Sequence, residues 1–269
     1  LFWTITHLVR KIVVRDDAES ISLPKMMVIM GAGLCGALAY TWSDTFWFSA
    51  VEGEVYGFSS FCTALVFWLI LKWENRADEP HSDRYLVLIA YVIGVSIAVH
   101  LLNLLCIPAI VLVFYYRKFK NVNAKGSLLA LGISFVLVAA ILYGLVPGYI
   151  KVAQFFELFF VNSVGMSYNS GVLIYGVLVV AVFVWSIYML YNSRNAALIK
   201  ASVAAVIILS GLPFVTDSGL VWFLLVAALL VYLYGFCKVL PQRVFNVVVM
   251  SIFVIFIGYS SYALLLIRA

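Results

Sequence analysis

The sequence predicts an all-α protein, a polytopic integral membrane helical bundle of about ten spans. The first reason is composition: 65% of the residues are hydrophobic and 11% are charged, whereas soluble domains carry about 25% charged residues. The second reason is the placement of the basic residues. When the apolar runs are read as ten alternating spans, fifteen of the seventeen Lys and Arg residues fall on one side. Short cytoplasmic loops retain Lys and Arg, so this side is predicted to be the cytoplasm.

The apolar runs and the polar loops between them place each predicted span in order. The runs directed outward are 25–43, 85–100, 126–147, 201–215 and 244–266. The runs directed inward are 1–14, 57–72, 103–117, 172–191 and 220–236. Only Lys151 and Arg268 then lie on the outer side.

The apolar run 85–117 has two interpretations. Its 33 residues would measure about 50 Å as one helix, while a bilayer core is roughly 30 Å thick. A single tilted helix would reverse every later span and divide the basic residues nine to eight. The charge distribution therefore favours two short helices with a break near 100–103, followed by Pro108. Such a turn must be buried in protein or line a wet cavity.

Two loops on the predicted outer side are long enough to hold structure, namely 44–56 and 148–171. Aromatic pairs at i,i+4 in the second loop, such as Phe155 and Phe159, would lie on one helix face. Each loop is expected to contain a short helix in the membrane interface, which by this topology is the periplasmic one. We predict a single transmembrane domain over 1–269, truncated at both ends.

Several function classes find no support in the sequence. The basic residues are spread over five short loops and form no patch for nucleic acid. Neither the four cysteines nor the acidic residues have metal-ligand spacing, so no metal site is predicted. The segment GAGLCG (31–36) matches a dinucleotide-binding pattern, but it lies within a span. Its glycines are expected to permit close helix packing.

Two carboxylates in an aromatic loop are the first candidate catalytic residues. Glu52 and Glu54 lie beside Tyr56 in 44–56, and carboxylates near lipid are costly unless they face water or a partner. In a helix, residues two apart point in different directions, so at most one is expected to face a cavity, and Glu54 is favoured. The alternative is an interfacial carboxylate that water or a helix N-terminus stabilises.

Polar residues at the break and two outer cations are candidate substrate-binding residues. His100 and Asn103 are expected either to cap the broken helix ends or to hydrogen-bond a phosphate or sugar. Lys151 would pair with a lipid phosphate, or instead extend to the interface or pair with Glu157. Arg268 has the same two interpretations.

The segments 46–74 (FWFSAVEGEVYGFSSFCTALVFWLILKWE) and 77–109 resemble a bacterial membrane family of unknown function that is likened to protein O-mannosyltransferases of the GT-C class. The segment 257–269 resembles that family's last span before a soluble periplasmic part. The family's first periplasmic loop carries a W-D-x-G-E-F-like acidic motif, which this chain lacks. The resemblance therefore implies that the main general base lies upstream of Leu1, with Glu52 and Glu54 auxiliary.

The resemblance implies a GT-C-like glycosyltransferase in the inner membrane of a Gram-negative bacterium. It would move a sugar, mannose by the likeness, from a polyprenyl-phosphate carrier to a Ser or Thr of a secreted protein or peptide. Membrane lipid, the lipid-linked donor and the acceptor are the expected partners, and no cofactor is expected. Two alternatives remain open from the residues: a transporter or flippase, because broken helices are typical of transporters, and a non-catalytic membrane scaffold.

Overall fold

The computed structural model describes residues 1–14, 21–53, 55–237 and 241–268, without the side chains of 261–268. The regular structure in these ranges is helical throughout. Seven of its helices are long and apolar enough to cross a membrane, and two shorter apolar helices accompany them. The chain is thus an all-helical, multi-pass membrane protein, while the count of ten spans stays a prediction. It divides into two compact units, Leu1–Leu131 and Gly132–Ala269.

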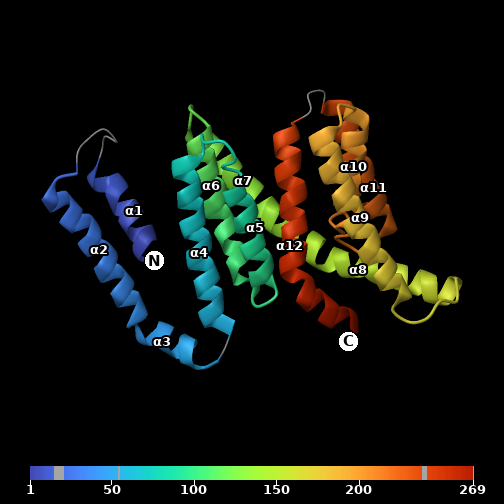
Figure 1. Cartoon of the computed structure of the whole chain (residues 1–269), viewed down its shortest axis with the longest axis horizontal. Helices are drawn as coiled ribbons and strands as arrows, with labels where there is room; N and C mark the ends of the chain where they lie inside the picture. Colours follow the sequence, from blue (N-terminus) through green and yellow to red (C-terminus); the bar gives the residue numbers. More distant parts are fainter. Residues whose placement is uncertain (15–20, 54, 238–240, 269) are drawn as a thin grey trace. The chain divides into compact units, whose positions relative to one another are not determined.

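In the first unit, the long helices run alternately up and down (Figure 1). The elements are α1 (Phe2–Val13), α2 (Leu23–Thr41), α3 (Asp44–Val51), α4 (Val55–Arg76), α5 (Arg84–Ile97), the 3-10 helix η1 (Leu101–Cys106), α6 (Ile107–Lys118) and the start of α7 (Ala124–Ala139). Helix α4 is central and contacts α1, α3, α5, η1 and α6. Its Val66, Ile70 and Trp73 are fully buried, so α4 forms the core of the unit.

Helices α1 and α2 pack closely because two glycines of α2 lack side chains. A Cβ atom on Gly33 would lie 2.4 Å from Thr6 Cγ2, and one on Gly36 would lie 2.7 Å from Ile5 Cδ1. Both distances are far below van der Waals contact. The prediction of helix packing for this glycine segment is confirmed at these two positions, whereas the Cβ position of Gly31 faces open space.

The predicted break within 85–117 is confirmed. Helix α5 ends at Ile97, and the backbone of His100 is extended, with φ −159° and ψ 134°. Helix η1 follows, and α6 begins at Ile107 with Pro108 in its first turn, where the missing N–H of proline has no helical partner to lose. Two antiparallel helices therefore replace the single long helix.

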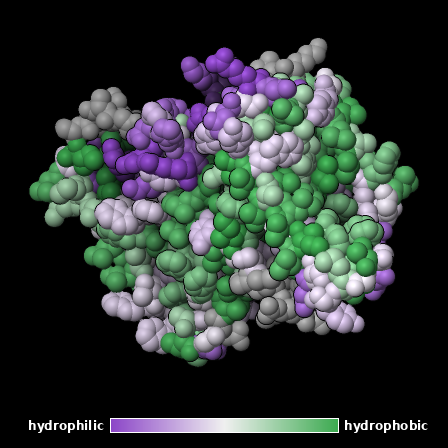
Figure 2. Space-filling model, turned by 45° about the vertical axis from the view of Figure 1, so that its right-hand side comes forward, coloured by the Kyte–Doolittle hydropathy of each residue, from purple (hydrophilic) through white to green (hydrophobic). Residues whose placement is uncertain are grey.

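The basic residues of the first unit gather at one end, which we call the basic end. It comprises the C-terminal ends of α1, α4 and α6 and the N-terminal ends of α2, α5 and α7, with Arg10, Lys11, Lys25, Lys72, Arg76, Arg84, Arg117, Lys118, Lys120 and Lys125. Figure 2 shows strongly hydrophilic residues gathered near the upper edge of the face in view, above largely hydrophobic helix flanks. This separation is what a membrane-crossing bundle requires.

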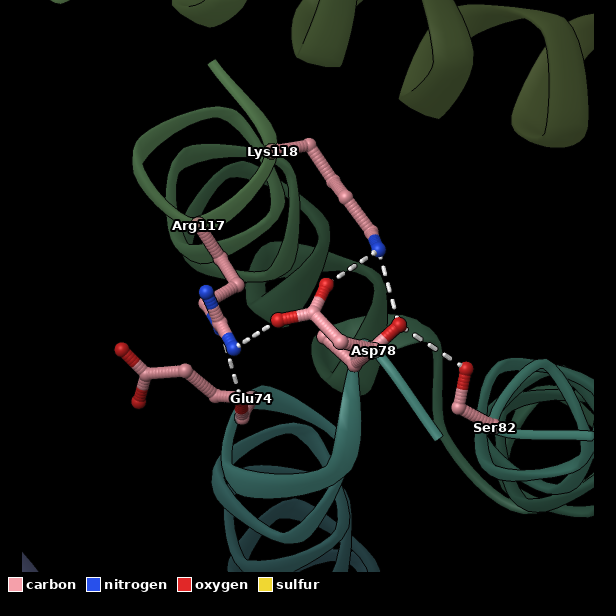
Figure 3. Close-up of polar contacts among 6 residues, drawn as sticks. Glu74, Asp78, Ser82, Arg117 and Lys118 are labelled. Atoms are coloured by element: carbon pink, nitrogen blue, oxygen red, sulfur yellow. Dashed lines mark hydrogen bonds and ion pairs between the residues drawn. The ribbon is translucent and has the colours of Figure 1, made fainter. Parts of the chain in front are cut away.

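A cluster of ionic contacts joins α6 to the turn between α4 and α5 at the basic end (Figure 3). Asp78 accepts hydrogen bonds from Arg117 and, at 3.3 Å, from Lys118. Lys118 Nζ also donates to the Ala77 carbonyl at 2.7 Å, and Arg117 Nε donates to the Glu74 carbonyl at 2.9 Å. The hydrogen bond from Lys118 and the charge of Arg117 lower the pKa of Asp78 below its usual value.

We expect Asp78→Asn to lower the melting temperature in detergent by about 1–3 °C, because exposed ion pairs contribute little. A carboxyl group whose pKa is lowered in the folded state stabilises the folded protein at pH values above its pKa in the unfolded state, which is about 3.9. That stabilisation is lost as the pH falls through the folded-state pKa. Thermal unfolding is therefore measured for both proteins from pH 8 to pH 3. The difference in melting temperature between Asp78→Asn and wild type should be constant down to about pH 4 and should shrink at lower pH. A difference that already vanishes at pH 6 would contradict this.

The second unit begins within α7 and contains α8 (Val146–Leu158), α9 (Ser170–Asn192), α10 (Ala196–Leu209), α11 (Gly219–Val231) and α12 (Gln242–Arg268). Short π-helical segments follow α7, α8 and α11, at Ala140–Leu145, Phe159–Ser163 and Tyr232–Phe236. Helix α9 contacts α8, α10 and α12, and its Tyr175 and Phe183 are buried. Figure 1 shows α8 lying crosswise to α9 and α12.

The helix does not end at residue 147, where the sequence predicted the end of a span. The helix continues from Ala124 to Ser163, because the π-helical turn at 140–145 precedes Pro147 and the proline lies in the first turn of α8. Helix α8 meets the turn after α10 at two glycines, where a Cβ on Gly148 would lie 2.0 Å from the Gly211 carbonyl oxygen. The 148–171 segment therefore contains a helix, as predicted, but this helix is fused to the preceding one and ends at Ser163, before the loop 164–169.

Candidate functional site

A cavity of about 530 Å³ lies in the first unit, in the half that is remote from the basic end. It is bounded by the start of α1, the end of α2, α3 and the first half of α4, with Leu102 of η1 at its edge. Five of its lining residues carry hydroxyl groups: Thr4, Tyr40, Thr41, Ser60 and Thr63. Phe46, Phe61 and Phe67 supply aromatic walls. We call it the hydroxyl-lined cavity, and its mixture of hydroxyls and aromatic rings suits a small polar ligand.

Two buried polar groups in and beside this cavity lack partners among the described residues. Thr4 Oγ1, in the cavity lining, is inaccessible and makes no hydrogen bond. Asn103 is 1% exposed; its Oδ1 accepts from Thr63 Oγ1 at 3.2 Å and from Cys106 Sγ at 3.1 Å, but its Nδ2 is unsatisfied. Buried polar groups normally have a protein or water partner. These two are therefore available to a ligand or to water.

Two further candidates meet where α4 begins. The rings of Tyr56 and His100 lie 5.4 Å apart between centroids. Tyr56 directly precedes the cavity residue Gly57, and His100 is two residues before the cavity residue Leu102. His100 Nδ1 accepts a hydrogen bond from the Leu102 backbone at 3.1 Å. The capping role predicted for His100 is thereby confirmed, while its role toward a ligand stays a prediction.

Glu52 lies in the turn between α3 and α4 and is not part of a helix. Helix α3 ends at Val51, and Glu52 is its exposed C-cap; α4 begins at Val55. The helical-spacing argument that separated the two carboxylates is therefore wrong for this turn. Glu54 itself lies outside the described residues, so its candidacy stays a prediction.

Lys151 belongs to α8 in the second unit, where it pairs with Asp217 at 2.6 Å. Glu157, the protein partner that the sequence suggested, instead accepts hydrogen bonds from the backbone N–H groups of Asn169 at 2.6 Å and Val172 at 3.0 Å. It thus stabilises the N-terminus of α9. The Lys151–Glu157 pair, one of the alternatives for Lys151, is therefore wrong. The side chain of Arg268 lies outside the described residues.

The comparison with family models identifies the stretch that contains this cavity. Residues 1–123 match the N-terminal domain of protein O-mannosyl-transferase TMEM260. The chain is thus similar to protein O-mannosyltransferases from α1 to the end of α6. No curated protein matches the chain. No solved structure matches it either.

The sequence indicated the neighbours of the hydroxyl-lined cavity but missed most of its lining. Its hydroxyl groups come from three helices and follow no motif. A usable signal was present on α4, where Ser60 and Thr63 are three residues apart and therefore share a helix face. Thr4 carries no comparable signal, because its importance depends on packing against α4, which only the fold reveals.

Proposed function

We propose that this chain acts as a membrane glycosyltransferase of the GT-C class, which moves a sugar from a polyprenyl-phosphate carrier to a hydroxyl group of a protein acceptor. The observation that carries this proposal is the O-mannosyltransferase match, because its 123 residues enclose the hydroxyl-lined cavity. The match favours mannose as the sugar and a Ser or Thr side chain as the acceptor.

The charge distribution supports the direction of transfer. If the basic end faces the cytoplasm, as short basic loops favour, the hydroxyl-lined cavity lies in the outer half of the membrane. In a Gram-negative inner membrane that half faces the periplasm, where secreted acceptors would arrive. The lipid-linked donor would reach the cavity from the same leaflet.

The proposed reaction is a substitution at the anomeric carbon. The acceptor oxygen forms a bond to that carbon, the bond from the carbon to the phosphate oxygen breaks, and the phosphate leaves with the electron pair. A carboxylate takes the hydroxyl proton, and of the two auxiliary candidates Glu54 is favoured over Glu52. Cations or hydrogen-bond donors must stabilise the leaving phosphate.

Different candidate residues would bind the phosphate and the sugar of the lipid-linked donor. His100 is the candidate for the phosphate in the first unit, while Lys151 and Arg268 belong to the second unit and stay candidate substrate-binding residues from the sequence. Tyr56 and the unsatisfied Asn103 amide are the candidates for the sugar hydroxyls. No metal or other cofactor forms part of this proposal.

Filling the hydroxyl-lined cavity should weaken donor binding. Ala64 lines the cavity on α4, and Ala64→Phe would place a ring in the space proposed for the sugar. We expect the KM for the donor to rise roughly tenfold or more. Leu88→Phe, at an exposed α5 position, should leave KM within about twofold. Equal KM values for the two variants would remove this cavity from the donor site.

The experiment that tests the function uses the full chain in native membranes. Radiolabelled polyprenyl-phosphate mannose and a Ser/Thr peptide are supplied, and a strain lacking the gene serves as control. Label in the peptide only when the protein is present would support transfer. The break between α5 and η1 favours a transporter as the second candidate. Donor or solute crossing the membrane, without label in any of a panel of acceptors, would replace the transferase with that alternative.

A further inference from the structure

A second cavity of the first unit lies at the basic end, between α1, α2 and α4. Its volume is about 390 Å³, and we call it the basic-end cavity. Its polar lining comprises Thr6, His7, Arg10, Lys72 and Asn75, and its other walls are Trp3, Ile29, Met30, Trp68 and Leu71. It is a different space from the hydroxyl-lined cavity, with which it shares no lining residue.

The two cations of this cavity differ from their neighbours in having no acidic partner within 1–14, 21–53, 55–237 and 241–260. Lys11 pairs with Glu74, and both Arg117 and Lys118 pair with Asp78. Within the described residues, Arg10 makes no ion pair, and Lys72 contacts only the ring of Trp68, 5.2 Å from its centroid. Two positive charges without an ion-pair partner in the part of the chain that the structure describes thus line one cavity.

The remaining polar groups already interact within the protein, although His7 Nε2 is buried and makes no hydrogen bond among the described residues. Thr6 Oγ1 donates to the Trp3 carbonyl at 3.0 Å, and His7 Nδ1 lies 3.3 Å from Asn75 Nδ2. His7 Nε2 lies 3.5 Å from Glu74, whose charge Lys11 balances. Arg10 and Lys72 are therefore the charged groups of the lining that remain for a ligand, and two positive charges favour an anion.

The apolar walls indicate that the anion carries hydrocarbon. Trp3 and Met30, which line the cavity, are 64% and 45% exposed. In a membrane-spanning unit, exposed apolar side chains face lipid. Tryptophan is enriched at the membrane–water interface. A ligand in this position would have its charged group between Arg10 and Lys72 and its chains along α2.

We propose that the basic-end cavity binds the phosphate headgroup of an anionic membrane phospholipid. Arg10 and Lys72 bind the phosphodiester, and Ile29, Met30 and Leu71 contact the first methylene groups. Basic pockets between membrane helices on the cytoplasmic side are typical headgroup sites. This inference rests on membrane insertion and does not depend on the transferase reaction.

The test is native mass spectrometry of the full chain, purified and delipidated in detergent. It is titrated with phosphatidylglycerol and with phosphatidylcholine of the same acyl chains. We expect a resolved one-to-one phosphatidylglycerol complex and at least tenfold weaker phosphatidylcholine binding. The Arg10→Gln/Lys72→Gln variant should weaken phosphatidylglycerol binding roughly 25-fold, equivalent to about 2 kcal/mol. Lys72→Arg, which keeps the charge, should retain binding.

Lys120→Gln/Lys125→Gln is the matched control, because both lysines are exposed at the basic end and neither lines the cavity. The control removes the same charge and should bind phosphatidylglycerol as wild type does. An equal loss in both double variants would overturn the site in favour of general surface attraction. Equal binding of the two lipids would also overturn it. Displacement of the lipid by inorganic phosphate at millimolar concentration would identify a free anion as the ligand instead.

Discussion

Gly211→Ala is expected to lower the free energy of unfolding by roughly 3 kcal/mol or more. Gly211 has φ +84°, in the left-handed region, and a Cβ there would lie 2.1 Å from the Gly148 carbonyl carbon. Alanine therefore causes backbone strain at residue 211, and its Cβ atom also clashes with the backbone at Gly148. Neither the Cβ atom nor that backbone can rotate away. Thermal unfolding in a fixed detergent should show a melting temperature about 6–12 °C lower.

Gly176→Ala is the control for this experiment. Gly176 lies within α9, and nothing lies within 4 Å of its Cβ position. Alanine there should be neutral or stabilise the helix by up to about 1 kcal/mol. Equal melting temperatures for the Gly211→Ala and Gly176→Ala variants would show that α8 and the turn after α10 do not approach as closely as described.

Glu54→Gln is expected to reduce kcat/KM for sugar transfer by about 10- to 100-fold. The amide keeps the size of the side chain but removes the charge, and a hydrogen bond to a charged group contributes about 1.5–3 kcal/mol. The measurement is initial-rate transfer of labelled mannose to peptide, with protein levels matched by quantitative blotting.

Glu52→Gln is the comparison for Glu54→Gln, because Glu52 is an exposed C-cap whose side chain makes no hydrogen bond or ion pair with another described residue. We expect its transfer rate to stay within about twofold of wild type. If Glu54→Gln transferred normally, Glu54 would have no part in the mechanism. If both variants lost activity equally, the turn as a whole, rather than one carboxylate, would matter.

The sequence was sufficient to predict the features that depend on the placement of charged residues and on the lengths of the apolar runs. The hairpin at 85–117 followed from counting Lys and Arg, because a single helix would have placed almost half of them on the wrong side. The structure places its break between Ile97 and Leu101, within a few residues of the prediction. The short helix α3 was likewise predictable from its interfacial composition.

Features that depend on contacts between distant residues were beyond the sequence. Lys151 and Asp217 are 66 positions apart, and nothing local favours this pair over Glu157. The hydroxyl-lined cavity depends in the same way on the packing of α1 against α4. The continuation through Pro147 was missed because a π-helical turn, which has no composition signature, prepares the helix for the proline.

The short α5 has a consequence for how the protein is made. Its 14 residues span about 21 Å as a helix, less than the roughly 30 Å of a bilayer core. The broken end at His100 would leave unsatisfied carbonyls in hydrocarbon if α5 entered lipid alone. Because α4 and η1 both pack against it, α5 must leave the translocon together with its neighbours. We therefore expect α4, α5 and α6 to be released into the membrane together. The ribosome would then have synthesised residue 118 before α5 contacts lipid.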